Sequence, residues 1–255
     1  MHSIWPRLWL VIASWVAGAL NAMAGGGSFL SFPALLGVGA PPIQANATNT
    51  VALWPGQFAS IMAFRDDYRP NARLLLPLCL AAGLGGFSGG IVLLHTGQTT
   101  FMRLVPWLLL IAALLFAVSV PVSRFLRARG PVAHRFPGLL FAGMVVVCFY
   151  IGYFGAGAGF LVMSLLGLHG IEKVNQINAL KAATTSIANG IAVLTFIVAK
   201  QVLWQDCLWM VLASSIGGYL GGRYSRRVDA QVMRGIVVAI GLSMASYFFW
   251  RGSRP

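Results

Sequence analysis

Four polar residues with helical spacing are the strongest candidates for binding chemistry in this chain of 255 residues. Asn178, Lys181, Thr185 and Asn189 follow one another at intervals of three or four, so they share one face of a helix. The surrounding segment, about 174–199, is otherwise apolar. An ionisable group inside such a segment indicates a functional site, because its burial is costly. The alternative is that Lys181 extends its side chain to the nearer aqueous interface.

A second polar set lies in the apolar segment at about 46–64 and consists of Asn46, Thr48, Asn49 and Gln57. One ammonium group together with several amides and hydroxyls suits an anion. Hydrogen bonding between helices is the alternative role for the Asn and Thr residues. All five acidic residues fall in or beside predicted loops, so the sequence offers neither a metal site nor a carboxylate proton relay, and no cofactor is expected.

Two glycine clusters are the third group of candidates: Gly25, Gly26 and Gly27 in the first half, and Gly155 and Gly157 in the second. Each cluster precedes a short apolar segment. Glycines interrupt a helix and expose backbone N–H groups, and the N-terminus of a helix attracts anions. At membrane depth such backbone is tolerated where protein or a watery cavity surrounds it. Each break therefore predicts a cavity, and the glycines are candidate substrate-binding residues.

Ten apolar segments must position these groups. The sequence places them at about 8–22, 28–38, 46–64, 74–94, 102–121, 139–153, 158–168, 174–199, 207–222 and 235–250. A full crossing takes about 20 residues. The segments 28–38 and 158–168 are too short, since 11 helical residues reach only about 16 Å, and they are interpreted as re-entrant half-helices.

The composition indicates a polytopic membrane protein. Apolar residues make up 58% of the chain and charged residues 9%, whereas soluble domains are about 25% charged. Membrane lipid is therefore an expected partner. The net charge of +13 is attributed to Arg and Lys in cytoplasmic loops, and nucleic acid is not expected as a partner.

A shift of 132 residues aligns the two halves of the chain. It places Asn46-Ala47 on Asn178-Ala179 and the run 85–90 on the run 217–222, both rich in glycine. We therefore expect two homologous repeats, 1–123 and 139–255, joined by a basic cytoplasmic linker at 124–138. The fold predicted is all-α, with a Gly-rich re-entrant hairpin and three long transmembrane helices in each repeat. The runs 85–90 and 217–222 are interpreted as packing surfaces.

Loop charges favour opposite orientations of the two repeats. If each hairpin dips into the membrane and returns, three arginine clusters near 65–73, 124–135 and 223–227 all lie in the cytoplasm, with both termini outside. A parallel arrangement is the alternative, and it exposes the third cluster on the outer face. Inverted repeats typically bind their substrate near the midplane, where the broken elements meet.

Four motifs together resemble the sulfite exporter TauE/SafE family of membrane transporters. They are NAMAGGGSFLSFP at 21–33, ANATNT at 45–50, GYFGAGAG at 152–159 and NALK at 178–181. The resemblance extends over essentially the whole chain. It implies a multi-pass protein of the bacterial inner membrane that moves small anions, typically sulfite or sulfonates such as sulfoacetate.

The leading hypothesis is therefore a secondary transporter or exporter of small, sulfur-containing anions, and not an enzyme. A permease for a cation or another small solute and a non-transporting membrane subunit stay open as alternatives. A homodimer is compatible with the sequence. An intramembrane enzyme would need a nucleophile–base pair or a cluster of metal ligands, and the sequence shows neither.

Overall fold

The computed structural model describes residues 4–23, 26–63, 67, 71–128, 137–171, 173–224 and 230–252. Within these ranges the chain is all-helical and contains no strand. Its helices are α1 (Ile4–Met23), α2 (Ser28–Gly37), α3 (Pro42–Ala63), α4 (Ala72–His95), α5 (Gln98–Ala128), α6 (Pro137–Tyr153), α7 (Ala158–Leu168), α8 (Val174–Val198), α9 (Trp204–Tyr224) and α10 (Ala230–Gly252). Every predicted apolar segment is a helix, so the all-α prediction is confirmed. α5 continues through Ala128, so the predicted linker starts inside a helix.

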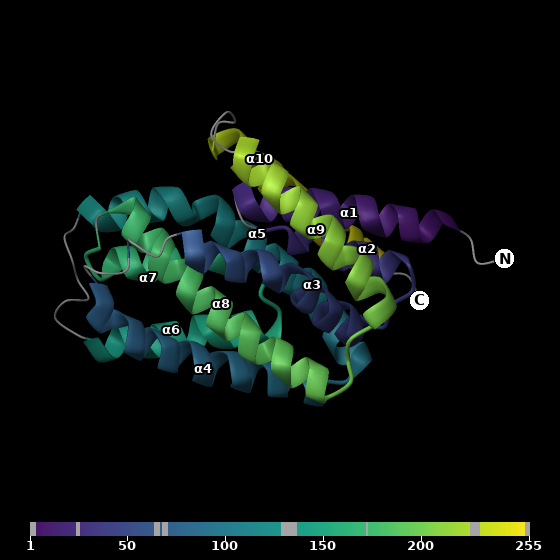
Figure 1. The fold of residues 1–255 in the computed structure, drawn as a ribbon, viewed down its shortest axis with the longest axis horizontal. Coiled ribbons are helices and arrows are strands. Elements are labelled where there is room, and N and C mark those ends of the chain that lie inside the picture. Colours follow the sequence, from purple (N-terminus) through teal and green to yellow (C-terminus); the bar gives the residue numbers. More distant parts are fainter. Residues whose placement is uncertain are drawn as a thin grey trace.

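Two ends of the molecule can be defined from contacts between distant segments. At end A, Gln98 of α5 accepts a hydrogen bond from the Ile43 backbone of α3, and Thr48 of α3 accepts one from the Leu203 backbone just before α9. At end B, Asn71 before α4 donates to Gln176 of α8. α3, α5 and α9 thus begin at end A, and α4 and α8 begin at end B. Figure 1 shows α1 and α2 towards one end of the fold, and α6 and α7 towards the other.

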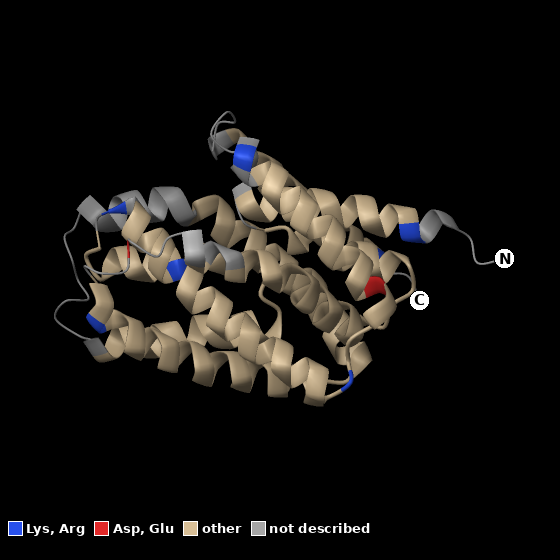
Figure 2. Ribbon diagram, viewed as in Figure 1, with Lys and Arg blue, Asp and Glu red and all other residues tan. Residues whose placement is uncertain are grey.

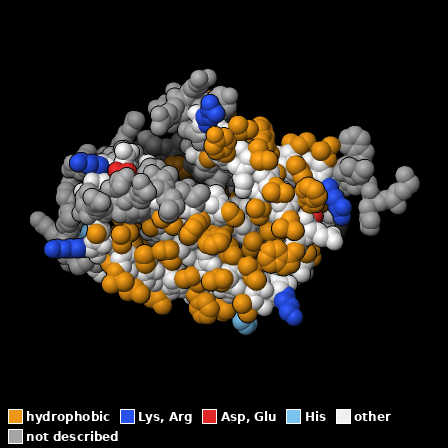
Figure 3. Space-filling model, viewed as in Figure 1, with side chains coloured by type: hydrophobic (Ala, Val, Ile, Leu, Met, Phe, Trp, Pro, Cys, Tyr) orange, Lys and Arg blue, Asp and Glu red, His pale blue; other side chains and the backbone are white. Residues whose placement is uncertain are grey.

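The outer surface has the character of a membrane protein. Large apolar side chains are exposed along single helix faces, as at Leu76, Leu80 and Leu84 of α4. On the face drawn in Figure 3, apolar side chains cover the middle while Lys and Arg lie at the margins, and Figure 2 shows the same preference of charge for the ends of the fold. α4, α5 and α8 contain described stretches long and apolar enough to cross a membrane.

Close helix packing depends on glycines spaced four residues apart. A Cβ atom on Gly221 of α9 would lie 2.6 Å from Ala19 Cα of α1, and one on Gly217 would collide with the Trp15 carbonyl. On α4, Gly85 and Gly89 meet the carbonyls of Val145 and Phe149 on α6 in the same way. Small residues let helix backbones approach closely in membranes. The glycine-rich runs at 85–90 and 217–222 therefore pack helices, as expected.

Candidate functional site

The second break, between α6 and α7, is a defined turn rather than a gap. Gly155 and Gly157 have φ values of 77° and 71°, a left-handed conformation that is strained for other residues. The Tyr150 hydroxyl donates to the Ala156 carbonyl at 2.8 Å and fastens the turn to α6. Tyr150 was not a predicted site residue, because nothing in the local sequence distinguishes it from the other aromatic residues of the segment.

The amino end of α7 leaves backbone donors weakly satisfied. Gly157 is the N-cap residue, and no side chain caps this described end of the helix. The N–H groups of Ala158 and Phe160 make hydrogen bonds of 3.4 Å, which are long. The start of α7 therefore presents the partial positive charge of a helix N-terminus with incompletely used donors.

Helix α8 carries Lys181 to the start of α7. A Cβ atom on Gly159 would lie 3.6 Å from Lys181 Cδ, so the aliphatic part of the lysine lies along the first turn of α7. Thr185 Oγ1 donates back to the Lys181 carbonyl at 2.8 Å. The predicted face of α8 is thus turned towards the second break. Gly159 was not a predicted site residue, although its position in the glycine-rich run 155–159 could have indicated it.

Asn189, two turns further along α8, joins both halves of the chain. Its Nδ2 donates to Gln57 Oε1 at 2.8 Å and to the Thr185 carbonyl at 3.0 Å. Its Oδ1 lies 3.8 Å from the position of a Cβ on Gly155. The structure therefore brings Gln57, Asn189 and Gly155 together, and places Lys181 and Thr185 on the same helix face. We refer to these residues with Gly157 and Gly159 as the α7–α8 cluster.

The first break is packed more tightly than the second. Gly26 has a φ of 92°, and a Cβ there would lie 2.7 Å from Val237 Cγ1. A Cβ on Gly27 would collide with the Ala17 carbonyl. Gly26 and Gly27 therefore permit close contact with helices α10 and α1. Gly25 lies outside the described residues.

Phe29 of α2 lies between the two breaks. Its ring is 3.1 Å from the Cβ position of Gly26 and 3.5 Å from that of Gly157, and the residue is 1% exposed. The broken elements thus approach each other, as expected of the two half-helices, with an aromatic ring filling the contact. Two cavities formed by described residues lie elsewhere, one between α1 and α9 and one beside His169.

The remaining polar residues of α3 act as braces. Asn46 Nδ2 donates to the Tyr153 carbonyl at 3.1 Å, at the last residue of α6, and Asn49 Oδ1 accepts from Ser31 of α2. Thr48 holds the connection before α9. All three α3 residues are buried. Asn46 and Asn49 thereby tie α3 to α6 and α2, which flank the two breaks. Asn178 is half-buried in α8, one turn before Lys181.

Asn46 Oδ1 and Ser186 Oγ are buried and have no hydrogen-bond partner among the described residues. Ser186 lies on α8 between Thr185 and Asn189, and its carbonyl accepts from Trp54 Nε1 at 2.9 Å. Ser186 was not among the predicted site residues. The described residues contain no group of three or more His, Cys, Asp or Glu side chains able to hold a metal ion.

Apolar flanks, helices of membrane length and a pair of broken helices define a multi-pass helical membrane protein. The chain belongs to the sulfite exporter TauE/SafE family, whose sequence model matches residues 10–248. It is similar to the probable membrane transporter protein ORF9 of Sinorhizobium sp, with 25% identity over 92% of this chain and 89% of that protein. No solved structure matches the chain.

Two further relatives carry similar names. The probable membrane transporter protein of Haemophilus influenzae is 26% identical, over 93% of this chain and 92% of its own length. The probable membrane transporter protein YfcA of Escherichia coli K12 is 25% identical, over 93% and 87% respectively. The chain is thus a membrane transporter of a small solute and not an enzyme. The expected multi-pass location in the bacterial inner membrane agrees with these relatives.

Proposed function

We propose that this protein is a secondary transporter or exporter of small anions, and that the anion binds at the α7–α8 cluster. The observation that carries the proposal is the placement of the Lys181 side chain along the first turn of α7. Lys181 carries a positive charge on a side chain that contacts the first turn of α7, and the amino end of that helix adds a partial positive charge. Both favour an anion. The described residues of the cluster include no carboxylate, which disfavours a cation as substrate.

Sulfur-containing anions such as sulfite, sulfoacetate or related sulfonates are the substrates we propose. Their tetrahedral or pyramidal oxygens accept several hydrogen bonds at once. Lys181 and the N–H groups at the start of α7 are donors of the required kind, and Asn178 is one turn away. The family name supports this substrate class. The glycines at 25–27 are proposed to approach the substrate from the opposite side, through movement of Phe29.

The two repeats are proposed to be inverted, with residues 1–123 and 139–255 related by a two-fold axis in the membrane plane. α1 packs on α9 as α6 packs on α4, and α3 packs on α9 as α8 packs on α4. Two hydrogen bonds join residues 132 positions apart, Asn189 to Gln57 and Trp54 to Ser186. Contact between equivalent residues is expected near such an axis. A homodimer stays a prediction.

Transport in proteoliposomes tests the proposal. The wild-type protein is expected to carry radiolabelled sulfite or sulfoacetate, and Lys181→Gln is expected to lower the flux about tenfold or more, since an anion loses a charge-assisted partner. Lys173→Gln is the matched control. This substitution removes the same charge, and Lys173 is exposed immediately before α8.

Two results would contradict the proposal. Equal flux for Lys181→Gln and wild type would remove the lysine from the substrate path and favour its extension to the interface. If a cation or a neutral solute is transported, and sulfite, sulfate, sulfoacetate and chloride are not, the protein is a permease of the alternative class.

A further inference from the structure

A groove between α1 and α9 remains outside the transport site. The two helices touch where their residues are small, around Gly18, Gly217 and Gly221. Towards the start of α9 the facing residues are large, and the helices leave a groove of about 330 Å³. Its described lining residues are Arg7 of α1 and, on a single face of α9, Gln205, Leu208, Trp209 and Leu212.

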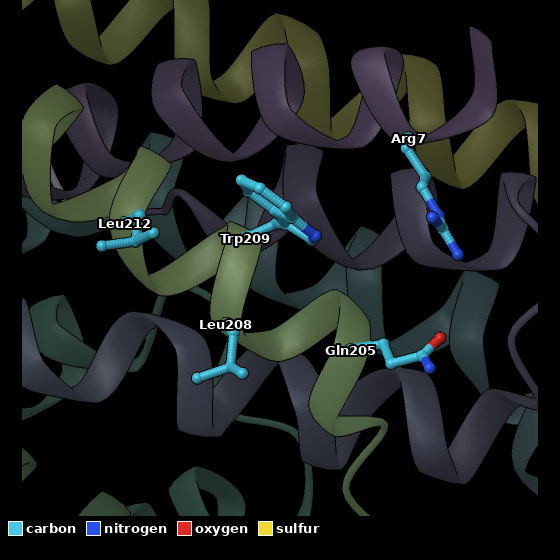
Figure 4. Close-up of a pocket in the computed structure, with 5 residues that line it drawn as sticks. All are labelled: Arg7, Gln205, Leu208, Trp209 and Leu212. Carbon is cyan, nitrogen blue, oxygen red and sulfur yellow. The ribbon is translucent and has the colours of Figure 1, made fainter. Parts of the chain in front are cut away.

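The groove is polar at one end and apolar at the other. Figure 4 shows Arg7 and Gln205 together at one end, Leu212 at the opposite end, and Trp209 between them with its indole nitrogen towards Arg7. Gln205 is the second residue of α9, so the polar end is at end A of the fold. Arg and Trp at a helix end are typical of the interface between membrane and water.

The apolar end faces the lipid. Leu208, Trp209 and Leu212 are all more than half exposed on the surface of the described helices. In a membrane that surface is in contact with acyl chains. An occupant of the groove must therefore combine an anionic group at the level of Arg7 with a hydrocarbon chain that continues along α9.

We propose that this groove binds an anionic glycerophospholipid. Arg7 and Gln205 donate hydrogen bonds to the phosphate of the headgroup, because a guanidinium and an amide N–H suit phosphate oxygens. Leu208 and Leu212 contact the first part of an acyl chain. The described lining residues include no carboxylate that could pair with the ammonium of an ethanolamine headgroup, so a lipid with net negative charge is favoured.

Native mass spectrometry of the purified protein in a non-ionic detergent tests this site. Phosphatidylglycerol is titrated against phosphatidylethanolamine with matched acyl chains. The wild-type protein is expected to bind one phosphatidylglycerol about tenfold more tightly than phosphatidylethanolamine. Arg7→Gln is expected to lose this preference. Arg103→Gln is the matched control, since Arg103 is exposed near the start of α5, at the same end of the fold, and does not line the groove.

A photoreactive phosphatidylglycerol provides a second measurement on the wild-type protein, with cross-links expected on α1 near Arg7 and on α9 between Gln205 and Leu212. Equal affinity of Arg7→Gln and wild type for phosphatidylglycerol would overturn the proposal, as would cross-links confined to other helices. Displacement of the lipid by millimolar inorganic phosphate would assign the site to the free anion. These measurements do not depend on transport, so they separate this proposal from the proposed function.

Discussion

Individual side chains at the second break divide into those that face the proposed anion and those that hold the backbone. Lys181 belongs to the first group and Tyr150 to the second. Asn189 combines the roles, since it bonds to Gln57 while its Oδ1 lies near Gly155. A buried amide with several partners is fixed in direction, so its remaining atoms are presented in a constant orientation.

Tyr150→Phe should loosen the second break without removing a substrate contact. The variant loses the hydrogen bond to the Ala156 carbonyl and leaves that acceptor unpaired. We expect the free energy of unfolding to fall by about 1 kcal/mol and the KM for the transported anion to rise more than the maximal rate changes. Thermal melts and concentration-dependent uptake measure both effects. Tyr247→Phe on the exposed face of α10 is the control; an unchanged KM in Tyr150→Phe would show that the turn holds without this bond.

Gln57 and Asn189 should be energetically coupled. Single and double alanine variants form a thermodynamic cycle, and hydrogen bonds between membrane helices average about 0.6 kcal/mol in such cycles. We expect a coupling energy of that order from denaturation in detergent. The same cycle with Gln57 and Thr195 serves as a reference. No coupling is expected there, because the Thr195 hydroxyl donates to Ile191 within its own helix. Strict additivity of the Gln57 and Asn189 substitutions would mean that the bond does not connect the halves.

At the scale of helices, glycine spacing decides which elements touch. α4 and α6, and likewise α9 and α1, meet through glycines four residues apart whose Cβ positions coincide with carbonyl groups of the partner helix. Such contacts place backbones side by side and leave little freedom for sliding. α2 packs against α1 and α7 packs against α6, so one long neighbour of each short helix is fixed by such a contact.

Gly89→Ala should destabilise the contact between α4 and α6. A methyl group there would collide with the Phe149 carbonyl and lie 2.8 Å from the Tyr153 backbone nitrogen. Overpacking of this kind costs about 1–3 kcal/mol, so the apparent Tm in detergent should fall. Gly167→Ala in α7 is the matched control, because nothing lies within 4 Å of its Cβ position, and alanine favours a helix. Equal melting of the two variants would contradict this packing.

For the whole molecule, the direction of each helix follows from the two ends of the fold. α3, α5 and α9 begin at end A, and α4 and α8 begin at end B. Arg73, at the start of α4, is therefore at end B, as is Arg223 in the last turn of α9. We propose that end B is the cytoplasmic one, because Arg73 and Arg223 favour it by the positive-inside rule. Inverted repeats require this orientation.

Labelling of single cysteines in intact cells tests this orientation. In a background with Cys79, Cys148 and Cys207 replaced by alanine, Gly97→Cys should react with a membrane-impermeant thiol reagent, and Ser225→Cys should react only after permeabilisation. The positions follow helices α4 and α9, which are equivalent in the two repeats. Reaction of both cysteines from outside would support the parallel arrangement instead.

The sequence by itself determined the helices, the two breaks and the polar face of α8, because these depend on local hydropathy, glycine content and a spacing of three or four residues. Only the tertiary structure decided which polar groups meet. Asn46 finds its acceptor 107 residues away, and Gln57 meets Asn189 across 132. The tighter packing of the first break could not be predicted either, since Gly26 and Gly155 both lie in similar glycine-rich runs of the sequence. The packing of Val237, Ala17 and Phe29 closes the first break, and their proximity depends on how distant helices cross.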